Sequence, residues 1–138
     1  MIGNKLKQII MNSSEVTAEI KRQCGKVSAL DNGWCHFVYQ RMHYVCIPDD
    51  RNETIRIVMP YVANSNDYKK DEVDAAVNET NKEMKYIKAI VLSNGSISLN
   101  YDHKTSGDED VGKIVGHIIK TLYIASEYLA VKLKSKKD

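Results

Sequence analysis

Apolar residues recur at two different spacings along the chain, and segments of the two kinds alternate. Spacings of three and four residues indicate one face of a helix, whereas alternation or short aromatic and β-branched runs indicate strands. Interpreted in this way, the sequence predicts the order helix, three strands, helix, two strands, helix. This order is typical of an α+β fold, which we expect as one domain over residues 1–138 with an antiparallel five-stranded sheet packed with helices.

The longest predicted helix covers Ser106–Leu133. Ser106 and Glu109 have the spacing of a capping box, in which each side chain bonds the other residue's amide. One apolar face runs from Val111 to Leu133, and further apolar residues lie off it. We expect this second stripe to contact the N-terminal helix or a second copy of the chain; its members are Ile119, Tyr123, Ile124, Tyr128 and Val131.

The first 25 residues are predicted to be helical, in two pieces between Lys5 and Ile20. Val16, Ala18 and Ile20 also alternate, so a short strand from Val16 to Ile20 is the alternative. A turn at Asp31-Asn32-Gly33 then separates this segment from the strands.

Aromatic and β-branched runs predict the remaining strands. The first three form a meander over Trp34–Gln40, Met42–Ile47 and Thr54–Val62. A helix begins near Asp71 and ends near Met84, and a hairpin with an Asn-Gly turn follows over Lys88–Leu92 and Ser96–Tyr101. In its second arm, Ser96, Ser98 and Asn100 are expected to face water.

Both faces of the first predicted hairpin are apolar. Trp34, Val38, Val45 and Ile47 lie on one face, and Phe37, Tyr39, Met42 and Tyr44 lie on the other. A sheet with two apolar faces needs cover on both, and one chain of this size has few elements to supply it. We therefore expect Trp34, Val38 and Tyr44, with the second stripe of the long helix, to bind a partner or form a dimer interface.

Composition narrows the class of protein. The chain has 138 residues, a net charge of +2 and 43% hydrophobic residues, which suits one globular domain and gives little reason to expect nucleic acid as a partner. No apolar run reaches membrane-spanning length, and the start of the sequence does not have the pattern of a secretory signal. Three cysteines do not form a disulfide framework, so reduced thiols and a cytoplasmic location are expected. Residues 132–138 form a basic tail.

His36 and His43 are the weak candidates for metal ligation. If the hairpin turns at Gln40 and Arg41, Cys35 faces Cys46, and His36 lies diagonal to His43 on one face. The sequence offers no third ligand at a recognisable spacing, so half-buried or solvated histidines are the favoured interpretation. Likewise, the two cysteines are interpreted as small apolar residues of the core.

Asn78 and Asn81 stand one turn apart in the middle helix, where asparagine is unfavourable. We expect them to bond a neighbouring strand or loop and so to fix the helix on the sheet, with ligand contact as the alternative. The sequence contains no glycine-rich phosphate loop and no nucleophile elbow, and an enzyme is therefore not predicted.

The element order resembles the type III secretion chaperone-like fold and, within it, the bacterial sensory transduction regulators known as YbjN-like proteins. The resemblance is most specific from Val77 to Tyr101, where Val77-Asn78-Glu79-Thr80-Asn81 leads into a strand, an Asn-Gly turn and a second strand. It implies a dimeric, non-catalytic domain, and secretion chaperones of this fold bind unfolded segments of other proteins.

We therefore expect a chaperone-like or regulatory interaction domain that needs no cofactor and binds a segment of a partner protein as a homodimer. The alternative is a small-ligand or metal-responsive regulator that uses His36 and His43 or the loop after Tyr101.

Overall fold

The computed structural model describes residues 13–49, 53–106 and 108–137, and the side chains as far as Leu133. Its elements follow in the order α2 (Ser13–Cys24), β1 (Val27–Ala29), β2 (Cys35–Tyr39), β3 (Met42–Asp49), β4 (Thr54–Asn64), the short 3-10 turn η1 (Ser65–Asp67), α3 (Lys70–Glu83), β5 (Ile87–Val91), β6 (Ser96–Lys104) and α4 (Val111–Lys137).

The strands form one antiparallel sheet in the order β1-β2-β3-β4-β6-β5. This confirms the α+β class, but the sheet has six strands among the described residues and not five, because Val27–Ala29 adds β1 at the edge. Ser13–Cys24 is helical, so the alternative of a strand at Val16–Ile20 is wrong. The first predicted helical piece, Lys5–Ile10, lies outside the described residues.

The hairpin of β2 and β3 has the predicted register. Gln40 and Arg41 form the turn with positive φ angles, 51° and 66°, and Cys35 pairs with Cys46 while His36 pairs with Val45. A two-residue turn with both φ angles positive matches the twist of the strands on either side of it. The short turn therefore fixes which side chains share a face.

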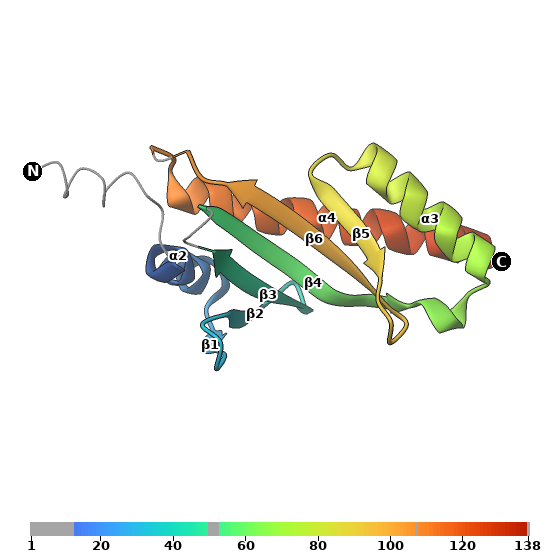
Figure 1. Ribbon diagram of the computed structural model, residues 1–138, viewed down its shortest axis with the longest axis horizontal. Helices are drawn as coiled ribbons and strands as arrows, with labels where there is room; N and C mark the ends of the chain where they lie inside the picture. Colours follow the sequence, from blue (N-terminus) through green and yellow to red (C-terminus); the bar gives the residue numbers. More distant parts are fainter. Residues whose placement is uncertain (1–12, 50–52, 107, 138) are drawn as a thin grey trace, which may run out of the picture.

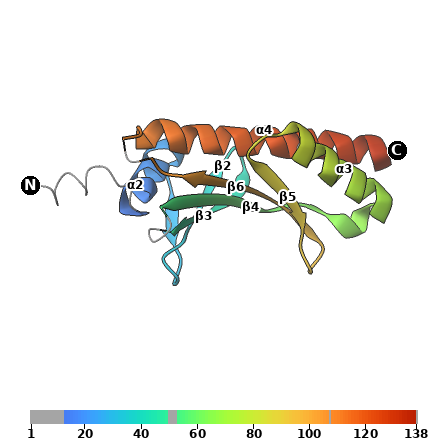
Figure 2. The ribbon, with the colours of Figure 1, turned by 45° about the horizontal axis from the view of Figure 1, so that its top comes forward.

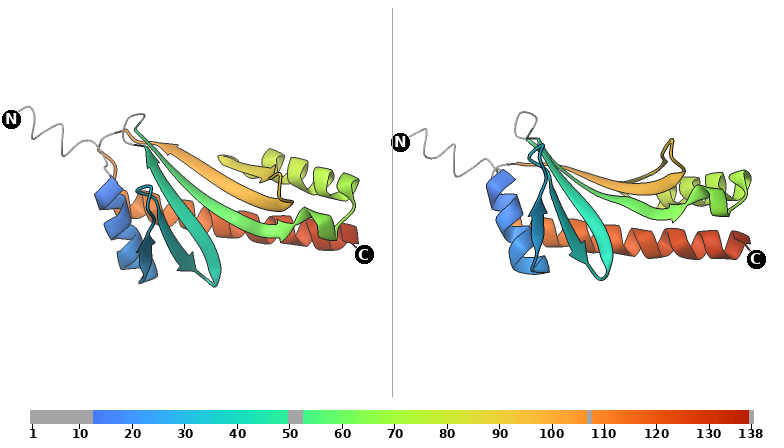
Figure 3. Two further views of the ribbon diagram at one scale, coloured as in Figure 1. Left: turned by 60° about the horizontal axis from the view of Figure 1, so that its bottom comes forward. Right: turned by 90° about the horizontal axis from the view of Figure 1, so that it is seen from below.

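The helices cover one face of the sheet, as Figures 1 and 2 show. α4 runs the length of the molecule and packs on β4 and β6, with α2 against it at one end and α3 at the other. Seen from the side, the opposite face of the sheet has no described helix over it (Figure 3). The core lies between α4 and the sheet, and its fully buried large side chains include Phe37, Tyr44, Ile57, Met59, Leu99, Ile118, Leu122 and Leu129.

The long helix starts later than the capping-box pattern predicts. Glu109 does reach back to the Ser106 amide, with Oε1 2.5 Å from the nitrogen. The helix itself begins at Val111, where the Asp110 carboxylate accepts from the Lys113 amide at 3.1 Å. Asp110 is thus the N-cap, and the Ser106–Glu109 pair shapes the preceding loop. The helix continues to Lys137 through most of the predicted basic tail.

The structure corrects two other expectations, one about exposed serines and one about apolar length. Ser96 and Ser98 are buried, although they lie on the open face of the sheet. β6 has neighbours on both sides, and Ile90 stands opposite Ser98, so larger side chains shield the small serines. The expectation that no apolar segment reaches membrane-spanning length is also wrong, because Val111–Leu133 does so by length and composition. Val115, Ile118 and Leu122 of this segment are fully buried in the core.

Candidate functional site

The open face of the β2–β3 hairpin is the main uncovered apolar surface near the predicted partner-binding residues. We call it the outer face and define it by Trp34, Val38, Val45 and Ile47. Trp34 and Val38 remain 38% and 40% exposed, and Val45 and Ile47 are half-buried. Among the described residues, no helix covers this face of the hairpin, in agreement with the expectation from its two apolar faces.

Tyr44 lies on the other side of the same hairpin, which we call the inner face. Its ring stacks on Phe37 with centroids 5.1 Å apart, and both side chains are buried on the face of the hairpin against which α2 packs. Tyr44 is therefore part of the core and not available to a partner. Burial raises the pKa of its hydroxyl far above the usual value, and that oxygen has no hydrogen-bond partner in the described structure.

The second stripe of α4 divides into buried and exposed members. Ile119 is 2% exposed and belongs to the core, while the Tyr123 ring meets Tyr39 edge-on at 6.0 Å. Ile124 and Val131 are 56% and 63% exposed. Tyr128 is half-buried, with the Lys132 ammonium 5.3 Å from its ring centroid. The helix thus leaves a narrow apolar strip on its outer side.

Cys35 and Cys46 form a cross-strand pair on the inner face. Both are buried and neither is in a disulfide. The Cys46 thiol hydrogen-bonds Cys35 and lowers the pKa of Cys35 to about 7, while the same contact and burial raise the pKa of Cys46. Cys46 is therefore the hydrogen-bond donor of the pair and Cys35 the acceptor.

His36 and His43 form the corresponding pair on the outer face. His36 Nε2 lies 2.8 Å from His43 Nδ1, and the rings stack with centroids 5.0 Å apart and an interplanar angle of 21°. Among the described residues, no three His, Cys, Asp or Glu side chains are grouped closely enough to hold a metal ion. The sequence predicted the pair correctly, but not that the two rings would touch.

Asn81 fixes α3 to the sheet, as the structural interpretation predicts. Its amide oxygen accepts from the Ala89 N–H at 2.6 Å, and its amide nitrogen donates to the Ala89 carbonyl at 3.1 Å. Ala89 belongs to the edge strand β5, so the side chain pairs with backbone groups that an added strand would otherwise use. Asn78 is exposed one turn earlier.

The loop after β6, which the sequence analysis names as an alternative ligand site, is held by contacts of His103 and Glu109. The Glu109 carboxylate bonds both the His103 ring and the Ser106 amide. Burial alone would raise the pKa of Glu109, but these contacts lower it below the usual value. The cluster closes the loop before α4 and lies apart from the exposed apolar surfaces.

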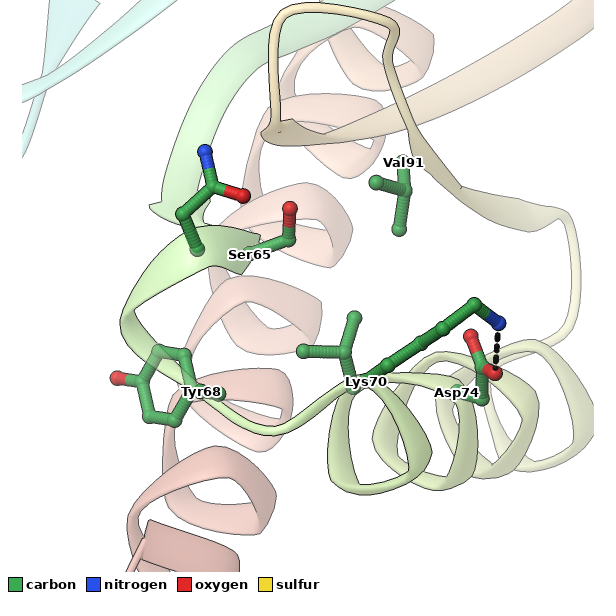
Figure 4. Close-up of a pocket in the computed structure, with 7 residues that line it drawn as sticks. Ser65, Tyr68, Lys70, Asp74 and Val91 are labelled. Carbon is green, nitrogen blue, oxygen red and sulfur yellow. Dashed lines mark hydrogen bonds and ion pairs between the residues drawn. The ribbon is translucent and has the colours of Figure 1, made fainter.

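Three of the grooves in the described surface lie near the residues discussed above. The first, of about 510 Å³, lies between η1, the start of α3 and the end of β5 (Figure 4). Its apolar residues are Val73, Val91 and Tyr68, and a Lys70–Asp74 ion pair at 2.9 Å lies at its rim. The Ser65 amide donates to the Gly95 carbonyl at 2.7 Å, which holds η1 against the turn between β5 and β6.

The second groove, of about 400 Å³, is continuous with the outer face. It lies where α2 passes into β1 and is lined by Cys24, Gly25, Lys26, Ser28, His36, Phe37 and Val38. The third, of about 610 Å³, follows the crossing of α2 and α4 and is polar, with Arg22, Lys113 and Lys120 along it. The second groove is therefore the one that extends an apolar surface.

The arrangement of the helices and sheet is the type III secretion chaperone fold. The chain is similar to a chain of the ExsC–ExsE complex, with a TM-score of 0.70, 10% identity, and coverage of 89% of this chain and 97% of the other.

It is also similar to a chain of the HopA1–SchA chaperone–effector complex, with a TM-score of 0.61, 9% identity, and coverage of 94% and 98%. For the Yersinia pestis type III secretion chaperone SycH, solved with a stable fragment of YscM2, the TM-score is 0.61 at 11% identity, and the coverage is 85% and 98%. No protein-family model and no curated protein sequence matches the chain.

Proposed function

We propose that this chain is a non-catalytic, chaperone-like or regulatory domain of the cytoplasm that binds a segment of a partner protein. The outer face carries the proposal, because Trp34 and Val38 are large, apolar and exposed, whereas Phe37 on the inner face is buried. Exposed apolar patches of this kind are typical of protein-binding surfaces. The similar chaperone–effector and SycH–YscM2 structures support the same class of function. Membership of the YbjN-like regulators stays a prediction.

The domain acts as a homodimer in this proposal, and the exposed strip of α4 is the contact. Ile124→Asp is a cleaner probe than a change at Tyr123, since Tyr123 touches Tyr39 inside the chain and Ile124 is 56% exposed. We expect light scattering to show a dimer for the native chain and a monomer for Ile124→Asp, with unchanged circular dichroism. A native chain that is monomeric at every concentration would contradict the dimer.

The partner-binding surface is tested with two matched variants. Val38 on the outer face and Val91 at the first groove are 40% and 41% exposed, so Val38→Asp and Val91→Asp place the same charge at equally open positions. We expect a protein retained from the native cell extract by the wild type and by Val91→Asp, identified by mass spectrometry, and lost with Val38→Asp. Loss with Val91→Asp alone would move the site to the first groove.

A further inference from the structure

The two histidines of the outer face have the spacing of two ligands on one metal ion. They come from adjacent strands, and the ladder fixes them: His36 pairs with Val45, and His43 pairs with Val38. His36 Nε2 and His43 Nδ1 lie 2.8 Å apart. Two nitrogens bound at about 2.0 Å to one ion, at right angles to each other, are separated by about 2.8 Å. This is also the separation of the hydrogen bond between the two rings, so both rings must turn to direct these nitrogens at one ion, while the nitrogens need not move apart.

We propose that His36 and His43 form a bidentate imidazole site for a divalent transition metal that favours tetragonal coordination, as Cu²⁺ and Ni²⁺ do. Imidazole suits both ions, and square-planar or tetragonal nitrogen and oxygen sites are diagnostic of them. Tetrahedral Zn²⁺ would need the two nitrogens about 3.3 Å apart, which is a larger change from the observed separation of 2.8 Å. The proposal is independent of partner binding.

Access and protonation both allow an ion to bind. His43 is exposed and His36 is half-buried, so hydrated ions reach the pair from solvent. In the free chain one ring donates its N–H to the other, which leaves one of the two facing nitrogens protonated. Binding requires that ring to hold its hydrogen on the opposite nitrogen, a change of tautomer that releases no proton when both rings are neutral.

The surroundings predict a labile site. No third His, Cys, Asp or Glu side chain completes it among the described residues, so water would fill the remaining coordination positions of a bound ion. Lys26 lines the groove beside His36, and a cation there disfavours a second positive charge. A reversible site with open positions differs from a closed structural zinc site, in which four protein ligands hold the ion.

The test uses tag-free protein titrated with CuCl₂ and NiCl₂ by calorimetry, with electron paramagnetic resonance of the Cu²⁺ form. We expect one equivalent of Cu²⁺ bound most tightly, with hyperfine structure from two imidazole nitrogens. Trp34 is the single tryptophan of the chain and lies two residues before His36, so Cu²⁺ should quench its fluorescence as the site fills. Zn²⁺ should bind more weakly than Cu²⁺ and Ni²⁺.

His36→Gln and His43→Gln should each weaken Cu²⁺ binding at least about tenfold, the loss that even outer-shell changes cause at metal sites. His117→Gln is the matched control, because His117 is an exposed histidine on α4, away from the hairpin. Circular dichroism without metal shows whether each variant is folded. Equal affinity for Cu²⁺ in the wild type and in the variant that carries both His36→Gln and His43→Gln would overturn the proposal. An equal loss of affinity with His117→Gln would also overturn it.

Discussion

The β2–β3 hairpin has two faces made by the same two strands, and they differ in almost every physical respect. The inner face stacks Phe37 on Tyr44 and pairs Cys35 with Cys46, all buried under the helices. On the outer face, the His36 ring contacts the His43 ring near solvent, beside an exposed Val38. Alternation along the strands therefore separates the packed core from an exposed apolar surface, because each residue serves one face only.

The largest expected effect on stability comes from a substitution on the inner face. Phe37→Ala removes a side chain that is 1% exposed and stacked on Tyr44 at 5.1 Å. We expect a loss of about 3–5 kcal/mol in the free energy of unfolding, since the lost transfer energy and the cavity both contribute. Urea unfolding followed by circular dichroism measures it. A loss below about 1 kcal/mol would mean that the inner face is not a packed core.

The second prediction concerns the unpaired hydroxyl of the inner face. Tyr44→Phe removes a buried oxygen that has no hydrogen-bond partner in the described structure and leaves the stacked ring in place. A buried polar group without a partner costs about 1–3 kcal/mol, so we expect the variant to be more stable than the wild type by about 1 kcal/mol. Thermal and urea unfolding check this, and a destabilised variant would reveal a water or partner at that oxygen.

The register of this hairpin could be predicted from the sequence because a two-residue turn at Gln40 and Arg41 leaves no freedom in pairing. The contact between the histidine rings could not, since it depends on side-chain rotation. Strand β1 was missed because Val27–Ala29 is too short to show a period. Its signal was the Asp31-Asn32-Gly33 turn, which closes the β1–β2 hairpin with Leu30 bonded to Trp34 at 2.9 Å.

The long helix shows that an apolar pattern alone does not determine which residues of a helix are buried. Its two apolar stripes indicated more than one packing neighbour, and α4 does pack on both the sheet and other helices. The second stripe is nevertheless divided, because Ile119 faces the core while Ile124 faces outward. α2 and α3 both pack beside α4, so its buried surface is wider than one stripe. The sequence cannot show how far those neighbours reach around the helix.

The third prediction concerns the pKa of Cys35 on the inner face, with and without the Cys46 thiol that donates a hydrogen bond to it. In a Cys24→Ala background, Cys46→Ala leaves Cys35 as the one thiol of the chain. Loss of the Cys46 hydrogen bond removes the largest cause of the low pKa of Cys35, while burial still raises it. We expect that pKa to rise from about 7 toward 9 or above. Ultraviolet absorbance of the thiolate against pH measures it, and an unchanged pKa would assign the effect to Thr17 or the backbone.

The smallest expected effect on stability comes from a substitution on the outer face. It tests whether that face is a free surface or part of the packed fold. Val38→Thr keeps the β-branched shape at a residue that is 40% exposed, so the free energy of unfolding should change by less than about 0.5 kcal/mol. Val16→Thr is the matched control, because Val16 on α2 is 1% exposed in the core. It should cost about 1–3 kcal/mol by burying a hydroxyl. If Val38→Thr destabilised the chain as much as Val16→Thr, the outer face would be part of the fold, and its exposed apolar residues would no longer argue for a partner.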